Sequence, residues 1–396
     1  MKLMRSSFLF LLATSTIVLL QACGEPPKPV QAPPTPKPDT LAVKPIEIPI
    51  DSNLTRIARL IAGMDTVLNY NHPNWNRNSI ANFSRETEAK YKVMRENRLQ
   101  KMAAWNNKNV QGAGISDSSF AFYPFSGGDF IHLHWLMPNA TEYLMAAREE
   151  VGTIPALLQM SDTAMLGYLG GIDKVLRDIY NKSYFITKNM ITDIHNANLV
   201  DGMLPILIWG AAKTNHEIIS IEFFNVDTTG QAIPAVSGKH QGVTISLKDV
   251  AENKQKKLTY LSADISNKGF TEHPEIKTFL NARVPAGCNS FVKSASYLMH
   301  YGSFTEIRDM VLDKSTSLVQ DDTGIPFKYF KQDIWNIHVF GDYEKPVSDF
   351  SENLFQAELN RAYQDSLFYK GPIDFSLGYH WGSGNQNQMF SYKKTR

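Results

Sequence analysis

The hydrophobic pattern of the chain changes its period part-way along, and this change limits the fold more than any other feature. Up to about residue 212, apolar residues recur at helical spacing, as between Leu54 and Leu68 and in the run that starts at Asp162. From His216 onward, apolar and polar residues alternate as they do in β-strands. Early helices and late strands predict an α+β fold, with a helical N-terminal part and a mixed sheet with flanking helices; the alternative is an α/β fold.

The same pattern gives the expected positions of individual elements. Helices are predicted in the run from Leu54, capped at Ser52, and at about 84–105, from Asp162, and at 185–196, 203–212, 274–283, 304–314 and 352–366. Strands are predicted at FAFY, YLMAARE, TSLV, 219–223, 243–247, 261–265 and 373–381, with a closing strand MFSY that completes a hairpin with 373–381.

The first 22 residues have the pattern of an export signal. Lys2 and Arg5 precede an uncharged, largely apolar run, which is too short for a membrane-spanning helix and suits a signal peptide. The run ends in Leu20-Gln21-Ala22-Cys23, which resembles the lipobox of bacterial lipoproteins. The resemblance implies cleavage before Cys23, lipidation of its sulfur with palmitate-type acyl chains, and anchoring to the lipid bilayer. The alternative is an ordinary secreted protein.

The segment after Cys23, residues 23–50, is expected to be a stalk. Nine prolines lie within residues 25–50, so this stretch favours an extended polyproline II conformation that reaches at most roughly 80 Å. No Asp follows Cys23. The usual inner-membrane retention signal is therefore missing, which favours the outer membrane of the cell envelope, with residues 51–396 facing the periplasm.

Composition narrows the function classes for this body. Without residues 1–22 the chain has 38 basic and 39 acidic residues, which offers no electrostatic case for binding nucleic acid. Only Cys23 and Cys288 are present, so a lipidated chain has no intrachain disulfide and needs a hydrophobic core. If the body is divided into two lobes, the Gly/Pro/Thr-rich stretch 227–241 is the candidate boundary.

Two loops that combine Gly with Asp are the candidate catalytic segments. Asp129 follows the predicted strand FAFY in the loop PFSGGD, and Asp321 and Asp322 follow the predicted strand TSLV. Functional groups often gather in loops beyond strand ends, so we expect these three carboxylates to belong to one site. The structural alternative is that Asp129 caps the next helix and Asp322 forms a turn.

Other patterns are weaker. His132 and His134 would point the same way on a strand and form a weak metal-site candidate; packed or surface histidines are the alternative. Ser290 and Lys293 match the S-x-x-K of penicillin-binding enzymes, but the K-T-G that this family needs is absent. Cys288 is expected to be a packed thiol. No phosphate-binding or dinucleotide motif is present, so no cofactor is expected.

Two segments resemble an uncharacterised family of bacterial exported proteins. They are FYPFSGGDF with the following MPNATEYLMAAREEVG, and KSASYLMHYGSFTEIRDMVLDKSTSLVQDDTGIPFKYF. The resemblance brings no activity, cofactor or catalytic residue with it. The sequence thus favours an envelope lipoprotein that binds an unknown ligand or maintains the envelope. The alternative is an envelope hydrolase that uses Asp129 and Asp321 or Asp322, with or without a metal ion.

Overall fold

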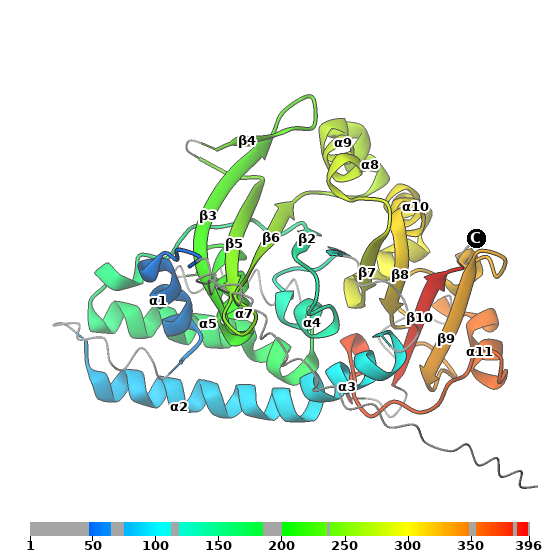
Figure 1. Ribbon diagram of the computed structural model, residues 1–396, viewed down its shortest axis with the longest axis horizontal. Helices are drawn as coiled ribbons and strands as arrows, with labels where there is room; N and C mark the ends of the chain where they lie inside the picture. The colour runs from blue at the N-terminus through cyan, green and yellow to red at the C-terminus, as the bar shows by residue number, and fades with distance from the viewer. Residues whose placement is uncertain are drawn as a thin grey trace, which may run out of the picture. The chain divides into compact units, whose positions relative to one another are not determined.

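One mixed sheet of ten strands organises the body of the chain (Figure 1). The computed structural model describes residues 47–64, 75–111, 119–184, 200–235, 238–347, 354–382 and 386–394. The signal peptide, Cys23, most of the stalk and the helix predicted at 185–196 lie outside these ranges. The strand order is β4-β3-β5-β6-β2-β1-β7-β8-β10-β9.

The centre of the sheet is parallel and its two sides are antiparallel. The five parallel strands are β6 (Lys254–Ser262), β2 (Glu142–Ala147), β1 (Phe120–Pro124), β7 (Cys288–Val292) and β8 (Ser315–Gln320). The antiparallel strands are β3 (His216–Val226), β4 (Ala232–Pro234) and β5 (Gly242–Asp249) on one side, and β9 (Trp335–Gly341) and β10 (Asn387–Lys393) on the other. The predicted α+β class with a mixed sheet is confirmed.

Helices cover both faces of this sheet, so its central strands are buried on both sides. All five residues of β1 are buried; Ala121 and Tyr123 pack in one core cluster, while Phe120 and Phe122 pack in the other. Such two-sided burial explains why β1 is apolar throughout.

The helices of the first face come early in the chain. They are α1 (Ser52–Ile61), α2 (Arg77–Met94), the π-helical turn η2 (Arg95–Leu99), α3 (Gln100–Asn109), α4 (Phe130–Leu136), α5 (Asp162–Lys182) and α7 (Leu204–Lys213). The other face carries α8 (Asn267–Glu272), α9 (Pro274–Arg283), α10 (Thr305–Lys314) and α11 (Ala357–Gln364). The prediction of helix N-termini is off by one residue in two cases, because the side chains of Asp51 and Ser161 cap α1 and α5, instead of Ser52 and Asp162.

One predicted strand is wrong. Residues 371–377 have no regular structure, and a short 3-10 helix, η9 (Gly378–Gly382), follows them. The closing strand β10 exists, but it pairs with β8 and β9, which occupy both of its edges. The apolar alternation at 373–381 reflects burial without strand pairing: Phe375 and Leu377 pack into the core, and Gly378 has a left-handed backbone with φ of +57°.

The stretch 227–241 lies within one structural unit. It contains β4 at the edge of the sheet, and residues before and after it contribute strands to that same sheet. The candidate lobe boundary is therefore a connection between β3 and β5. Within the described ranges, no helix is both long and apolar enough to cross a membrane.

Candidate active site

A cavity of about 600 Å³ opens at the carboxyl ends of the parallel strands. Its wall is formed by residues that directly follow β1, β2, β6 and β7, together with Tyr184 and Tyr379. Strand β1 pairs with β2 on one side and with β7 on the other. The order of the parallel strands therefore runs outward from β1 in both directions. Open α/β sheets usually bind ligands at such a switch point. We call this space the carboxyl-edge cavity.

A buried cluster around Asp129 forms part of the cavity wall. One carboxylate oxygen of Asp129 lies 2.8 Å from the Lys293 ammonium, and the other lies 2.6 Å from Nδ1 of His132. The Tyr123 hydroxyl donates a third hydrogen bond, at 3.3 Å. Lys293 also donates to the carbonyl of Ser183, the residue that ends α5. These contacts tie together the ends of β1, β7 and α5.

The charges of this cluster compensate each other. Burial acts to raise the pKa of Asp129, but His132 and the Lys293 ammonium outweigh burial and hold this pKa below its ordinary value. Burial lowers the pKa of His132 to about 4, so its ring is neutral at neutral pH. Asp129 and Lys293 are therefore the charged pair, and a neutral His132 must donate from Nδ1 to the carboxylate.

Ser294 occupies a turn immediately after Lys293. Its backbone φ is +58°, in the left-handed region that non-glycine residues seldom adopt, and it begins the 3-10 helix η5 (Ser294–His300). Its amide donates to Oγ1 of Thr323 at 2.7 Å. Ser294 lines the cavity, and its buried hydroxyl has no hydrogen-bond partner among the described residues. A strained position with a free hydroxyl is typical of a functional residue.

Asp321 lies next to Ser294. Its Oδ1 accepts hydrogen bonds from the amide and hydroxyl of Thr323, whereas its buried Oδ2 has no partner in the described parts of the chain. Burial and the neighbouring Asp322 raise the pKa of Asp321 to about 6, against the opposing effect of His380. A Cβ atom at Gly378 would lie 2.6 Å from Oδ2 of Asp321 and 2.8 Å from Oγ of Ser294. Both oxygens therefore lie close against Gly378, at a position where any larger residue would clash with them.

Asp322 has a different environment although it is the next residue. Its Oδ1 pairs with Nε2 of His380 and accepts a hydrogen bond from the Asn387 side chain at 3.2 Å. The Asp322 amide donates to Oδ1 of Asn387 at 2.8 Å. Asp322 thus fastens η9 and β10 to the end of β8, while Asp321 keeps one free oxygen.

The predicted catalytic carboxylates come to one edge of the sheet, but they do not act as one cluster. Asp129 and Asp321 are linked through Lys293, Ser294 and Thr323, whereas the carboxylate of Asp322 is held by His380. The prediction that Asp129 caps the next helix is not met by its side chain, which makes no capping hydrogen bond to α4.

The H-x-H pair lies on a helix, so the same-side arrangement that a strand would give these two rings is wrong. His132 and His134 are both in α4, where residues two apart point about 200° apart. His132 contacts Asp129, and Nδ1 of His134 lies 3.1 Å from the Tyr143 hydroxyl. Among the described residues, no group of three His, Cys, Asp or Glu side chains is placed to hold a metal ion.

Sequence reasoning missed Ser294, and it mentioned Lys293 for a different reason. The S-x-x-K match paired Lys293 with Ser290, but Ser290 points to the opposite face of β7, where its hydroxyl lies 2.7 Å from that of Ser315. The available signal was a Lys-Ser pair directly after the apolar end of a strand. Cys288 is buried, and burial raises the pKa of its thiol, as suits a packed residue.

Two comparisons with known proteins found no match. No model of a known protein family matches the chain, and no match among curated proteins is found.

Proposed function

We propose that this protein is a lipid-anchored envelope hydrolase that cleaves small esters or amides in the carboxyl-edge cavity. The main support for the hydrolase proposal is the pair formed by Ser294 and Asp321. Each has a buried oxygen without a partner among the described residues, and both oxygens lie close to Gly378, where a Cβ atom would clash with them. A hydroxyl close to a carboxylate whose pKa is raised to about 6 is a combination that can serve nucleophilic catalysis.

In the proposed reaction, Oγ of Ser294 attacks the carbonyl carbon of the substrate and its proton passes to Oδ2 of Asp321. The tetrahedral intermediate collapses, the bond to the leaving group breaks, and Asp321 returns the proton to the leaving alcohol or amine. Water then attacks the acyl-serine ester with Asp321 again as the base, which releases the acid and restores the Ser294 hydroxyl. Lys293 and Asp129 are positioning residues, because their buried ion pair fixes the turn that carries Ser294.

A serine-directed fluorophosphonate probe tests this proposal on the detergent-solubilised full chain. We expect the probe to label the native protein at Ser294, as located by mass spectrometry, and to leave Ser294→Ala unlabelled. Ser126→Ala is the matched control, because Ser126 lines the same cavity but its hydroxyl already donates to the Gly127 carbonyl. Labelling that persists in Ser294→Ala, or a folded native protein that never reacts, would overturn the proposal.

Two further variants address the base and the close contact at Gly378. Asp321→Asn should slow labelling by about 100-fold or more, and the native rate should rise with pH through about 6, where Asp321 loses its proton. Gly378→Ala should also suppress labelling, because its methyl group would clash with the two oxygens. A flat pH profile between 5 and 7 would remove Asp321 from the mechanism.

A second candidate function is ligand binding without chemistry. Four tyrosines line the cavity, and the ring centroids of Tyr184 and Tyr379 lie 4.6 Å apart in an edge-to-face arrangement. Aromatic walls with a few polar groups are common in binding proteins. This candidate, which is the function favoured by the sequence alone, replaces the hydrolase if the native protein binds small molecules in this cavity but shows no serine reactivity.

The proposed anchoring rests on the sequence. Cys23 follows the lipobox-like Leu20-Gln21-Ala22, and two or more acyl chains hold a protein to a bilayer stably. Cys23→Ser should therefore release the protein from the membrane fraction of cells. A variant that still sediments with membranes after a salt wash would show that the anchor is not Cys23.

A further inference from the structure

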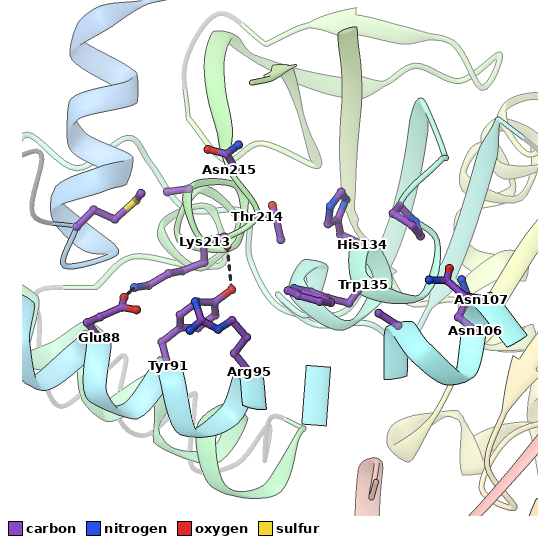
Figure 2. A pocket seen from close by; sticks show the side chains of 14 residues that line it. Glu88, Tyr91, Arg95, Asn106, Asn107, His134, Trp135, Lys213, Thr214 and Asn215 are labelled. Carbon is purple, nitrogen blue, oxygen red and sulfur yellow. Dashed lines mark hydrogen bonds and ion pairs between the residues drawn. The ribbon is translucent and has the colours of Figure 1, made fainter. Parts of the chain in front are cut away.

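A second cavity, of about 580 Å³, lies at the opposite edge of the sheet. It is bordered by α2, η2, α3, α4 and the turn between α7 and β3, as Figure 2 shows. Pro138 precedes β2 and Asn215 precedes β3, so this cavity is at the amino ends of these strands. We call it the Arg95 cavity, and the proposed hydrolase makes no use of it.

The two cations of the Arg95 cavity differ in how closely they are paired. Nζ of Lys213 lies 2.8 Å from the Glu88 carboxylate, and the two charges neutralise each other. Burial lowers the pKa of His134 well below its ordinary value, so His134 is neutral. The guanidinium of Arg95 has a long ion pair with Glu96, at 3.9 Å on the half-exposed outer side, and lies over the Tyr91 ring, 5.9 Å from its centroid.

The inner side of Arg95 is prepared for a hydrogen-bond acceptor. Its Nε is buried, yet it has no partner in the part of the chain that the structure describes. A buried donor without an acceptor is costly, and binding an anion would satisfy it with a charge-assisted hydrogen bond.

The rest of the wall is apolar and aromatic. Trp135 extends from α4 toward Tyr91 and Arg95 (Figure 2), and Met64, Ala103 and Pro138 complete the apolar lining. The Tyr91 hydroxyl is already engaged with the Lys213 carbonyl, at 2.9 Å, which fixes the ring in place. Rings held in this way offer flat surfaces for stacking, beside a cation that can bind a negative group.

We infer that the Arg95 cavity binds a small organic anion with a flat apolar body, such as an aromatic carboxylate. The carboxylate pairs with the Arg95 guanidinium, and the apolar body lies between Tyr91 and Trp135. A purely apolar ligand would leave Nε of Arg95 unsatisfied, so the negative charge is the main requirement.

Naphthalene-2-carboxylate is a suitable probe, with the uncharged 2-naphthalenemethanol as its counterpart, in calorimetric titrations of the full chain. We expect saturable binding of the acid and at least tenfold weaker binding of the alcohol. This comparison uses the native protein, so it stands even if a variant fails to fold. Equal affinities for the two compounds, or no binding of the acid up to millimolar concentration, would overturn the inference.

Two arginine variants then locate the site. Arg95→Gln should weaken binding of the acid at least tenfold, because a neutral amide replaces the guanidinium. Arg85→Gln is the matched control: Arg85 is exposed on α2, the helix that leads directly into η2, and it donates to Asn82 at 3.2 Å. Equal effects of the two substitutions would show that the acid binds elsewhere. Serine reactivity in the carboxyl-edge cavity is measured separately, so either result can fail without the other.

Discussion

The ion pairs beside the two cavities differ in how far their acidic partners are exposed to water. In the carboxyl-edge cavity, the charges of Lys293 and Asp129 meet with side-chain exposures of 1% and 2%. In the Arg95 cavity, Lys213 is as buried as Lys293, at 2%, but the side chain of its partner Glu88 is 50% exposed. One pair is enclosed by protein and the other is open to water on its acidic side.

This difference shows which groups are structural in each cavity and which remain free. The enclosed pair cannot be separated without leaving a charge in the interior, so it fixes the ends of β1 and β7. The free groups there are a hydroxyl and an acid, Ser294 and Asp321. In the Arg95 cavity, the donor without a partner among the described residues is Nε of the Arg95 cation. The first cavity is therefore suited to chemistry on a neutral substrate and the second to holding an anion.

Breaking the enclosed pair should have the largest effect on stability. Lys293→Met keeps the volume of the side chain but leaves the Asp129 carboxylate buried without its cation, which should lower the free energy of unfolding by about 3–5 kcal/mol. Adding Asp129→Asn removes the unpaired charge and should recover part of the loss. Urea denaturation of the two variants provides the measurement. A loss below about 1 kcal/mol for Lys293→Met would show that water reaches Asp129.

The next largest effect is a pH-dependent one at Asp321. Its pKa is raised to about 6 from an ordinary value of 3.8, so the folded chain binds this proton more tightly than the unfolded chain does. Ionisation of Asp321 therefore costs no stability below about pH 4, costs progressively more up to pH 6, and costs a constant amount above it. Asp321→Asn removes that cost, and its Oδ1 can still accept from Thr323.

We expect Asp321→Asn to stabilise the protein by about 2–3 kcal/mol at pH 7 and by nothing at pH 4. The measurement is urea denaturation of native and variant protein across this range. Asp374→Asn is the control, since the Asp374 side chain is 73% exposed and its replacement should change little at any pH. A gain that is the same at pH 4 and pH 7 would show that the Asp321 carboxylate is not destabilised by burial. A variant more stable than the native protein yet unreactive toward the probe fits a functional residue.

The sequence predicts the elements of this fold better than it predicts how they are joined. Continuous apolar strands such as β1 and alternating strands such as β5 stand out because burial determines their composition. Burial alone also produced the wrong strand at 373–381, where the described residues are assigned to no strand. The run FIHLHWL forms a helix, whereas the metal-site hypothesis for its two histidines required a strand, and short apolar runs do not distinguish the two.

The candidate site follows the same logic. Asp129 and Asp321 were found because Gly- and Asp-containing loops after strands are visible in the sequence. The roles of Lys293 and Ser294 were not found, because they depend on partners far away in the chain. The cation of Lys293 is paired only once β1 lies beside β7. The left-handed turn at Ser294 is held by Thr323 from the end of β8, and no local pattern announces it.

The smallest effect on stability should come from breaking the ion pair between Lys213 and Glu88. This prediction is the strictest test of the comparison between the two cavities. Lys213→Met removes the 2.8 Å contact with Glu88 and the contact of the ammonium with the Tyr91 ring, 4.5 Å from its centroid. Because Glu88 is half exposed, water can solvate its carboxylate once the cation is gone, so we expect a loss of only about 1 kcal/mol. Lys293→Met and Lys213→Met exchange the same groups at equal burial. The difference between their unfolding free energies therefore reports the exposure of the acidic partner. Equal losses of unfolding free energy in the two variants would mean that burial of the lysine alone sets the cost of losing its charge. The contrast between the two cavities would then have no energetic basis.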